Sequence, residues 1–476
     1  MTSDQESFVK KFVEHLFEGD AAVFAGAGFS APAGFVNWSE LLSEIAEELG
    51  LDIEQETDLI TLAQYHHTQK GRQKINHKIV AEFSEQARES ENHRILARMP
   101  ITTVWTTNYD RVIENAYLSN SKRPDVKYTN DHFNVNKSRR DVIVYKMHGD
   151  VENPQHAIIT KYDYQNYSST HQPFITALRG DLVTKTFLFV GFSFTDPNLD
   201  YILSRVRRDY GPDTKNHYCI FRRLKLEDKG SETPEKLTYN SIKQELLIEE
   251  LKRSYNIHTV LIDSYSEITI MLKEVEKRYK QKTIFISGSA ASYEPHTSEE
   301  GVGFTHKLAK LLIQKGYTLV NGFGLGIGSA IINGALEAIY DEPTKYSEAQ
   351  LILRPFPQFA TGDKTLPTLW QEYREKMLSY AGIAIFIFGN KLVNERIENA
   401  PGILAEYDIA VQQGLFILPI GATGYQAKEV WGRVEESYKE RSQEFLTELN
   451  KLQDETKPLD ELLPVIIKIL NSINKK

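Results

Sequence analysis

A glycine-rich turn near the N-terminus, "GAGFS" (26–30), directly follows the apolar stretch "AAVFA". A strand that ends in such a turn leaves backbone N–H groups for a phosphate, so Gly26 and Gly28 could let a dinucleotide approach the backbone. Ala31 stands where the third glycine of G-x-G-x-x-G belongs, and no acidic residue ends an obvious second strand, which argues against an ordinary NAD dehydrogenase. Glycines that serve only helix packing are the alternative.

Polar side chains follow two later apolar stretches. Asn108 and Asp110 in "TTNYD" come just after one stretch, and His148 in "KMHGD" comes just after another. Open α/β sheets bind ligands at the carboxyl edge of their strands, so we expect these three side chains at that edge. Polar residues that merely end strands are the alternative interpretation.

A third apolar stretch ends in "GFSFTDP" (191–197). Gly191 supplies a small, flexible position at the strand end, and Ser193 supplies a hydroxyl. The pair Asp196-Pro197 is typical of a helix start, with Asp196 as N-cap and Pro197 in the first helical position.

A second glycine-rich turn, "GFGLGIG" (322–328), lies almost 300 residues after the first, and "SGSAAS" (287–292) ends a neighbouring apolar stretch. Small residues at two strand ends leave room for a phosphorylated ligand across adjacent loops. Glycines that serve only close packing are again the alternative. The candidate ligand contacts in these two turns are Gly288, Ser289, Gly324, Leu325 and Gly326.

A helix start at "PGILAEYDIA" (401–410) places Glu406 one turn into the helix. A carboxylate at this position could accept hydrogen bonds from two ribose hydroxyls. Acidic residues are also common near helix N-termini for electrostatic reasons alone.

Short apolar strands alternate with helical segments along the whole chain, which predicts parallel sheets covered by helices on both faces. An amphipathic helix at 266–282 closes the first series, and the pattern restarts with "TIFISGSAAS". We therefore predict an α/β protein of two Rossmann-like, doubly wound domains with parallel sheets, residues 1–281 and 282–476.

Composition excludes several classes of function. A chain of 476 residues is too long to fold around a single hydrophobic core. A formal charge of −9 argues against a nucleic-acid partner. Cys219 is the one cysteine, which excludes intrachain disulfides and a thiolate zinc cage. The N-terminus lacks the apolar segment of a signal peptide, and no apolar run suffices for a membrane span, so we expect a cytoplasmic protein without membrane contacts.

Together, "GAGFSAPAGF", "TTNYD", "MHGD" and "GFSFTDP" resemble the NAD-binding core of sirtuins, in the same order and over about residues 10–280. The resemblance implies that Asn108 and His148 lie over the nicotinamide ribose and carry the catalysis. It further implies an NAD-binding set that comprises Gly26, Ala27, Gly28, Ser30, Asp110, Gly191 and Ser193.

Hydrolysis of NAD+ at such a site needs few groups. Nicotinamide leaves as a neutral base, and the transition state is oxocarbenium-like, as in glycoside hydrolysis. His148 would act as the base, directly or through a ribose hydroxyl, because imidazole titrates near neutral pH. Asn108 would orient the water or the ribose hydroxyls.

Departures from the sirtuin pattern narrow the chemistry. Protein-deacylating sirtuins carry a four-cysteine zinc module, and this chain has one cysteine, so no metal is expected. The equivalent interval, 119–141, is polar and turn-rich. These features favour NAD hydrolysis over protein deacylation. A non-enzymatic sensor that binds NAD without consuming it is the remaining alternative.

The second set of motifs resembles the SLOG family of nucleotide-binding Rossmann-like domains. Some members are phosphoribohydrolases with a "PGGxGTxxE" motif. Here Ile403, Leu404 and Ala405 replace its central residues, which favours binding of a nucleotide over its cleavage.

A sirtuin-like domain followed by a SLOG domain resembles the NAD-consuming effectors of Thoeris antiphage defence. The resemblance implies an NAD+ hydrolase that a cyclic ADP-ribose isomer, made by a TIR-domain partner, activates by binding to the SLOG domain. It also implies a homo-oligomer, a tetramer or larger. Ligand contacts would fall on Arg374, Lys391 and Glu406, with Arg354 in reserve, because cations can pair the pyrophosphate.

Overall fold

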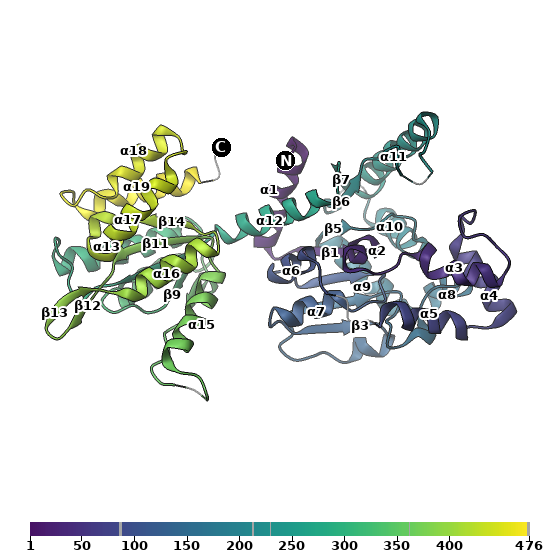
Figure 1. Cartoon of the computed structure of the whole chain (residues 1–476), viewed down its shortest axis with the longest axis horizontal. Coiled ribbons are helices and arrows are strands. Elements are labelled where there is room, and N and C mark those ends of the chain that lie inside the picture. Colours follow the sequence, from purple (N-terminus) through teal and green to yellow (C-terminus); the bar gives the residue numbers. More distant parts are fainter. Residues whose placement is uncertain (85–87, 212–213, 229, 361, 474–476) are drawn as a thin grey trace. The chain divides into compact units, whose positions relative to one another are not determined.

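The computed structural model describes residues 1–84, 88–211, 214–228, 230–360 and 362–473. The chain divides into two compact units, Met1–Glu276 and Lys277–Lys476. Each unit contains one large sheet whose strands all pair in parallel (Figure 1). The predicted α/β fold class is therefore confirmed.

The first unit is built on a seven-stranded sheet that begins at its centre. From β1 the chain adds strands on one side and then crosses to β5 on the other, so its direction reverses between β1 and β5. Both strands are buried along their whole length, as expected for a sheet covered on two faces. In spatial order the strands are β3 (Pro124–Lys127), β4 (Val142–Lys146), β2 (Thr103–Thr106), β1 (Ala21–Ala25), β5 (Thr186–Val190), β6 (His217–Arg222) and β7 (Ile257–Ile262).

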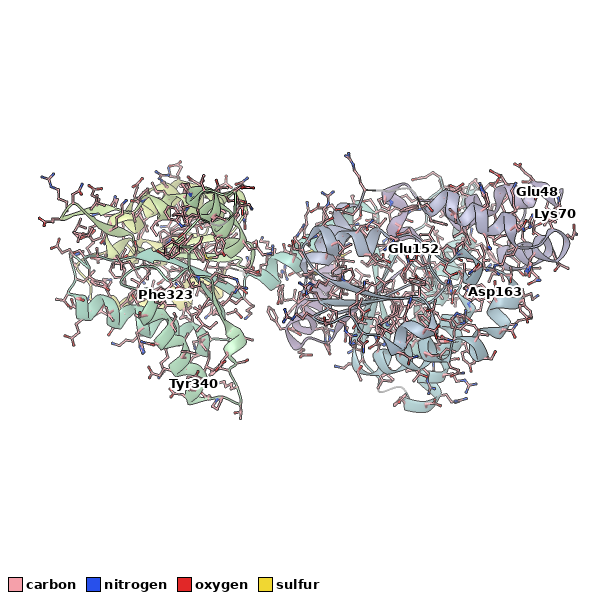
Figure 2. All side chains as sticks on the ribbon, turned by 90° about the horizontal axis from the view of Figure 1, so that it is seen from below. Glu48, Lys70, Glu152, Asp163, Phe323 and Tyr340 are labelled. Atoms are coloured by element: carbon pink, nitrogen blue, oxygen red, sulfur yellow. The ribbon has the colours of Figure 1, made fainter. Side chains whose placement is uncertain are left out.

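Helices flank this sheet (Figure 1), and local capping chemistry sets where several of them begin. Asn37 and Glu40 form a capping box at α3, and Asp196 caps α10 with Pro197 next to it. Helices α3, α4 and α5 share an apolar cluster with Tyr109, Val151, Ala157 and Ile159, and Glu48 and Lys70 lie on the outer surface of these helices (Figure 2). The helices are α1 (Ser3–Glu18), α2 (Ala27–Ser30), α3 (Trp38–Glu48), α4 (Leu59–Lys70), α5 (Gln73–Phe83), α6 (Glu91–Arg98), α7 (Val112–Ser119), α8 (Lys161–Thr170), α9 (Gln172–Thr184), α10 (Pro197–Tyr210), α11 (Pro234–Tyr255) and α12 (Ser266–Lys280).

The second unit repeats this plan with five parallel strands and reverses direction between β8 and β11. Its sheet order is β10 (Leu351–Leu353), β9 (Thr318–Asn321), β8 (Thr283–Ser289), β11 (Ile383–Phe388) and β14 (Phe416–Pro419), and a separate hairpin pairs β12 (Asn390–Val393) with β13 (Arg396–Asn399). The helices are α13 (Ser298–Gln314), α14 (Gly328–Asp341), α15 (Leu366–Ser379), α16 (Pro401–Gln412), α17 (Tyr425–Glu435), α18 (Gln443–Lys451) and α19 (Leu462–Ser472).

Strand β3 lies within the interval that the sequence described only as polar and turn-rich. Its Asp125 and Lys127 side chains are buried and lie 3.0 Å apart as an ion pair. Mutual neutralisation lets these charges occupy positions that apolar residues usually fill, which hides the strand from a hydrophobicity pattern. Within the described residues, no helix combines the length and apolar character needed to cross a membrane.

Candidate functional site

The loops after β1 and β5 meet at the point where the first sheet reverses direction, the usual ligand site of such sheets. Gly26 N–H donates to Val190 O and Gly28 N–H donates to Gly191 O, each at 3.0 Å. Gly191 has φ +65°, and a Cβ there would lie 2.1 Å from Phe29 N. These two amides are therefore engaged within the protein, not free as the turn alone had suggested, and the glycines let two backbones touch.

Two adjoining cavities line this junction, of about 590 and 630 Å³. Gly28, Gly191 and Ser193 border both of them. Ala27 and His148 border the first. The second is mostly apolar and reaches β6, α11 and α12. Two adjoining cavities, one with a more polar lining than the other, suit a dinucleotide, which has two chemically different ends.

Asn108 is held rigidly after β2. Its backbone N–H donates to Thr106 Oγ1 at 3.0 Å, and its Nδ2 donates to Gly26 O at 3.1 Å and to Ser30 Oγ at 3.0 Å. Its Oδ1 is buried and has no hydrogen-bond partner among the described residues. Two hydrogen bonds thus orient the side-chain amide, a third holds its backbone, and the amide keeps an acceptor for an O–H group.

His148 follows β4 and is almost fully buried. Its Nε2 lies 3.2 Å from Asp196 Oδ2, at ion-pair distance but without an aligned hydrogen-bond partner among the described residues. Burial acts to raise the pKa of the Asp196 carboxyl, but His148 and the Leu199 N–H outweigh it and hold that pKa below its usual value. The pair therefore places an ionised carboxylate behind the candidate base.

Asp110 lies two residues after Asn108, and neither of them is among the residues that border the two cavities. Its Oδ1 accepts from Val112 N–H at 3.0 Å, and burial raises the pKa of its carboxyl although Lys146 opposes the shift. Its carbonyl oxygen accepts from Lys146 Nζ at 2.5 Å. Asp110 is thus built into the structure that supports the site.

Lys146 is a buried cation that the sequence interpretation did not single out. Its Nζ donates to Tyr109 O at 3.0 Å, lies 3.1 Å from Glu114 Oε1 and contacts the Asp150 carboxylate. Burial acts to lower the pKa of Lys146, but the carboxyls of Glu114, Asp150 and Asp110 keep it above its usual value. A lysine at an inward position of the strand "VIVYK" is the signal that could have revealed it.

The second unit has the same kind of junction between the loops after β8 and β11. A Cβ on Gly324 would lie 2.0 Å from Gly288 O, and one on Gly326 would lie 2.0 Å from Ala290 O. Ala290 N–H donates to Leu325 O at 2.8 Å. The alternating glycines therefore allow this loop to pack directly on the backbone of the loop after β8.

Two apolar side chains of this loop are exposed. Leu325 is 66% exposed and Phe323 (Figure 2) is 51% exposed. Phe323 has φ +60°, a conformation that a hydrogen bond of 2.7 Å from its N–H to Asn321 Oδ1 supports. An exposed aromatic group held in this way can contact a ligand at the sheet edge.

Glu406 of α16 and Arg374 of α15 come together beside Ser287 of β8. Ser287 Oγ donates to Glu406 Oε2 at 2.5 Å, and Arg374 Nε lies 3.7 Å from Glu406 Oε1. Burial raises the pKa of Glu406 to about 7, although Ser287 and Arg374 oppose the shift. The Arg374 guanidinium also lies over the Phe356 ring, and its Nε is buried without a hydrogen-bond partner among the described residues.

Among the described residues, no hydrogen bond or ion pair joins the other predicted contacts of the second unit to this pair. Lys391 lies in hairpin strand β12, in register with Glu398, and the Arg354 guanidinium lies over the Tyr380 ring. Ser289 Oγ donates to Asn390 O at 2.9 Å. Asn390 Oδ1 also accepts from two backbone N–H groups, so this residue, which the sequence interpretation missed, organises the loop after β8.

Comparison with known proteins agrees with both halves of this description. The model of the SIR2-like domain matches residues 102–257, and that of the Sir2- and TIR-associating SLOG family matches residues 267–473.

Relatives match over nearly the full length. NAD(+) hydrolase ThsA of Cytobacillus dafuensis is 44% identical, over 99% of this chain and 97% of its own length. The protein of that name from Bacillus cereus (strain MSX-D12) is 45% identical over 98% of each chain, and that from Acinetobacter baumannii (strain 532279) is 42% identical over 98% of each. Identity at this level and coverage shows common family membership. The chain belongs to the ThsA family of NAD(+) hydrolases.

Proposed function

We propose that the junction of β1 and β5 in an N-terminal domain, residues 1–281, hydrolyses NAD+ to nicotinamide and ADP-ribose. We further propose that a C-terminal domain, residues 282–476, binds a cyclic ADP-ribose isomer that activates this reaction. The observation that carries the first proposal is the buried, unpaired Oδ1 of Asn108, which follows β2 at the same edge of the sheet where His148 follows the neighbouring strand β4.

The reaction follows from these two side chains. Nicotinamide departs from C1′ of the ribose with the electron pair of the glycosidic bond and becomes neutral, so the site supplies no acid. Asn108 Oδ1 accepts a hydrogen bond from the attacking water or a ribose hydroxyl and fixes its position. The water oxygen bonds to C1′, and His148 takes the proton.

Substitution of the two residues tests this assignment. We expect Asn108→Ala and His148→Ala each to lower nicotinamide release by at least about 100-fold, since positioning and general-base catalysis each contribute that much or more. His258→Ala, on edge strand β7, is the matched control and should keep wild-type turnover. Full turnover in the Asn108 and His148 variants, with the fold intact by circular dichroism, would refute the catalytic assignment.

Two observations support the activator site in the second unit. A carboxyl with a pKa of about 7 can accept ribose hydroxyls, and the neighbouring guanidinium can pair a pyrophosphate. The SLOG model that matches this unit is described as Sir2- and TIR-associating, in keeping with a nucleotide signal from a TIR-domain partner. Loss of NAD during phage infection is the resulting defence.

Arg374→Ala tests the activator site. It should abolish the gain in NAD+ hydrolysis that a cyclic ADP-ribose isomer produces, while basal hydrolysis remains. Arg433→Ala, which removes an exposed ion pair with Glu429, is the matched control and should keep the full gain. A full gain in the Arg374 variant would reject this site, and parallel assays with different isomers identify the activator.

Assembly and substrate range complete the proposal. We expect a homo-oligomer, a tetramer or larger, which light scattering on the full chain measures. A protein deacylase would release nicotinamide in proportion to added acyl-lysine peptide, and a non-enzymatic sensor would bind NAD+ without consuming it. Hydrolysis that is independent of peptide separates the proposed function from both.

A further inference from the structure

We propose that Asp196 is a positioning residue for NAD+ hydrolysis, which holds His148 in place and stabilises the charge that the imidazole acquires. The inference rests on the proposed function of His148. It assigns a second role to a side chain that the sequence marks only as a helix cap.

Two hydrogen bonds hold the Asp196 carboxylate in place. Its Oδ1 accepts from Leu199 N–H at 2.9 Å and so caps α10, and its Oδ2 accepts from Tyr164 Oη at 3.3 Å. With its rotation restricted in this way, Oδ2 faces His148 Nε2 at 3.2 Å. Asp196, His148 and Tyr164 all border the same 590 Å³ cavity.

The charges around His148 single out this carboxylate. The titratable groups that face the imidazole are Tyr164 and Tyr167 of α8, His171 at the start of α9, and Asp196. Burial raises the pKa of both tyrosines, and burial with the nearby His148 lowers the pKa of His171 to about 4, so all three are neutral at pH 7. Asp196, whose pKa is lowered, is the anion of this group.

The geometry also gives the two ring nitrogens of His148 different roles. Because Nε2 faces the carboxylate, Nδ1 is the nitrogen that takes the proton from the attacking water as its oxygen bonds to C1′. The resulting imidazolium lies beside a carboxylate, which favours its charge. Capping of α10 alone requires only Oδ1, so the Oδ2 contact is a separate feature.

Asp196→Asn separates the two roles, because asparagine caps helices as well as aspartate does but carries no charge. We expect kcat to fall about 10- to 100-fold, part of what a general base contributes, with KM nearly unchanged. The acidic limb of the pH–kcat profile should move to lower pH, since removal of the anion disfavours the imidazolium. Tyr164→Phe, which frees Oδ2 from one hydrogen bond, should shift kcat in the same direction and by less.

The matched control is Asp20→Asn. Asp20 also pairs with a histidine, His15, at 3.0 Å, but it precedes β1 and so lies at the opposite edge of the sheet. This variant should keep the wild-type kcat and pH profile. Should Asp196→Asn fail to fold, Asp196→Ser, which retains a capping oxygen, takes its place.

Each outcome decides the question. A folded Asp196 variant with wild-type kcat and pH profile overturns the inference, as does a loss of kcat that only follows the loss of folded protein without a shift in the profile. Full activity in Asn108→Ala and His148→Ala would instead overturn the proposed function, so the two failures are distinguishable.

Discussion

Lys146→Met removes a buried positive charge while it keeps a side chain of similar length. In the wild type this one cation lies among three buried carboxyl groups, those of Asp110, Glu114 and Asp150. Removal of one partner from a buried ion pair costs about 3–5 kcal/mol, because the remaining charge is left uncompensated. We therefore expect the first unit to lose about 3–5 kcal/mol of stability at pH 7 and the second unit to lose none.

Hydrogen exchange measures this loss for each unit separately. At about 1.4 kcal/mol per factor of ten, the protection of peptides from β2 and β4 should fall roughly 10²- to 4 × 10³-fold. Peptides from β8 and β11 serve as an internal control. Lys74→Met, which removes a surface ion pair with Glu48, should change protection by less than roughly tenfold.

The stability that the first unit loses in Lys146→Met should also depend on pH. Burial raises the pKa of Asp110 and Glu114, and a carboxyl whose pKa is raised on folding stabilises the fold at low pH and loses that contribution as pH rises. Without Lys146, ionisation of these carboxyl groups destabilises the fold more strongly. The difference in stability between wild type and variant should therefore be larger at pH 8 than at pH 5. Protection of β2 and β4 that stays within tenfold of wild type at both pH values would refute this account of the buried cluster.

Three further predictions concern the candidate sites. Glu406→Gln should stabilise the ligand-free second unit above pH 7, because the wild type loses stability as pH rises through the pKa of about 7; equal thermal unfolding of wild type and variant at pH 8.5 would contradict this. Gly191→Ala should destabilise the first unit by about 2–4 kcal/mol and raise KM for NAD+, because its Cβ would clash with the Phe29 backbone. The control is Gly180→Ala, where a Cβ meets nothing within 4 Å; urea denaturation should show that it leaves stability unchanged or raises it. Hydrolysis should survive treatment with EDTA, because one cysteine cannot form a thiolate zinc module; loss of activity that zinc restores would refute this.

Strand positions were predictable wherever burial requires apolar residues. The run "TFLFV" is buried throughout in β5, and the helix start predicted at Asp196-Pro197 is the start of α10 (Pro197–Tyr210). Strand β3 was not predictable, because Asp125 and Lys127 replace the apolar pattern with a buried ion pair. Hairpin β12–β13 also escaped prediction, since β13 is exposed along its whole length and carries no pattern of burial.

Candidate site residues were predictable as far as strand ends and turns reveal them. Asn108 and His148 follow strands of one parallel sheet, and parallel topology alone brings such positions to a common edge. The sequence does not show whether a backbone amide is free. The Gly26 and Gly28 N–H groups have the appearance of an anion site, but their partners lie at the end of β5 and just after it, more than 160 residues later.

The sequence by itself determined the parallel α/β class, the two successive sheets and the resemblance to NAD-consuming effectors, because periodicity, turn residues and short motifs are local properties. Only the tertiary structure decided that Lys146 is a buried cation among three carboxyl groups and that Asp196, an N-cap in the sequence, faces His148. The physical reason is that burial and pairing depend on distances between groups far apart along the chain. A helix cap has the same local signal whether its second oxygen meets water or an imidazole.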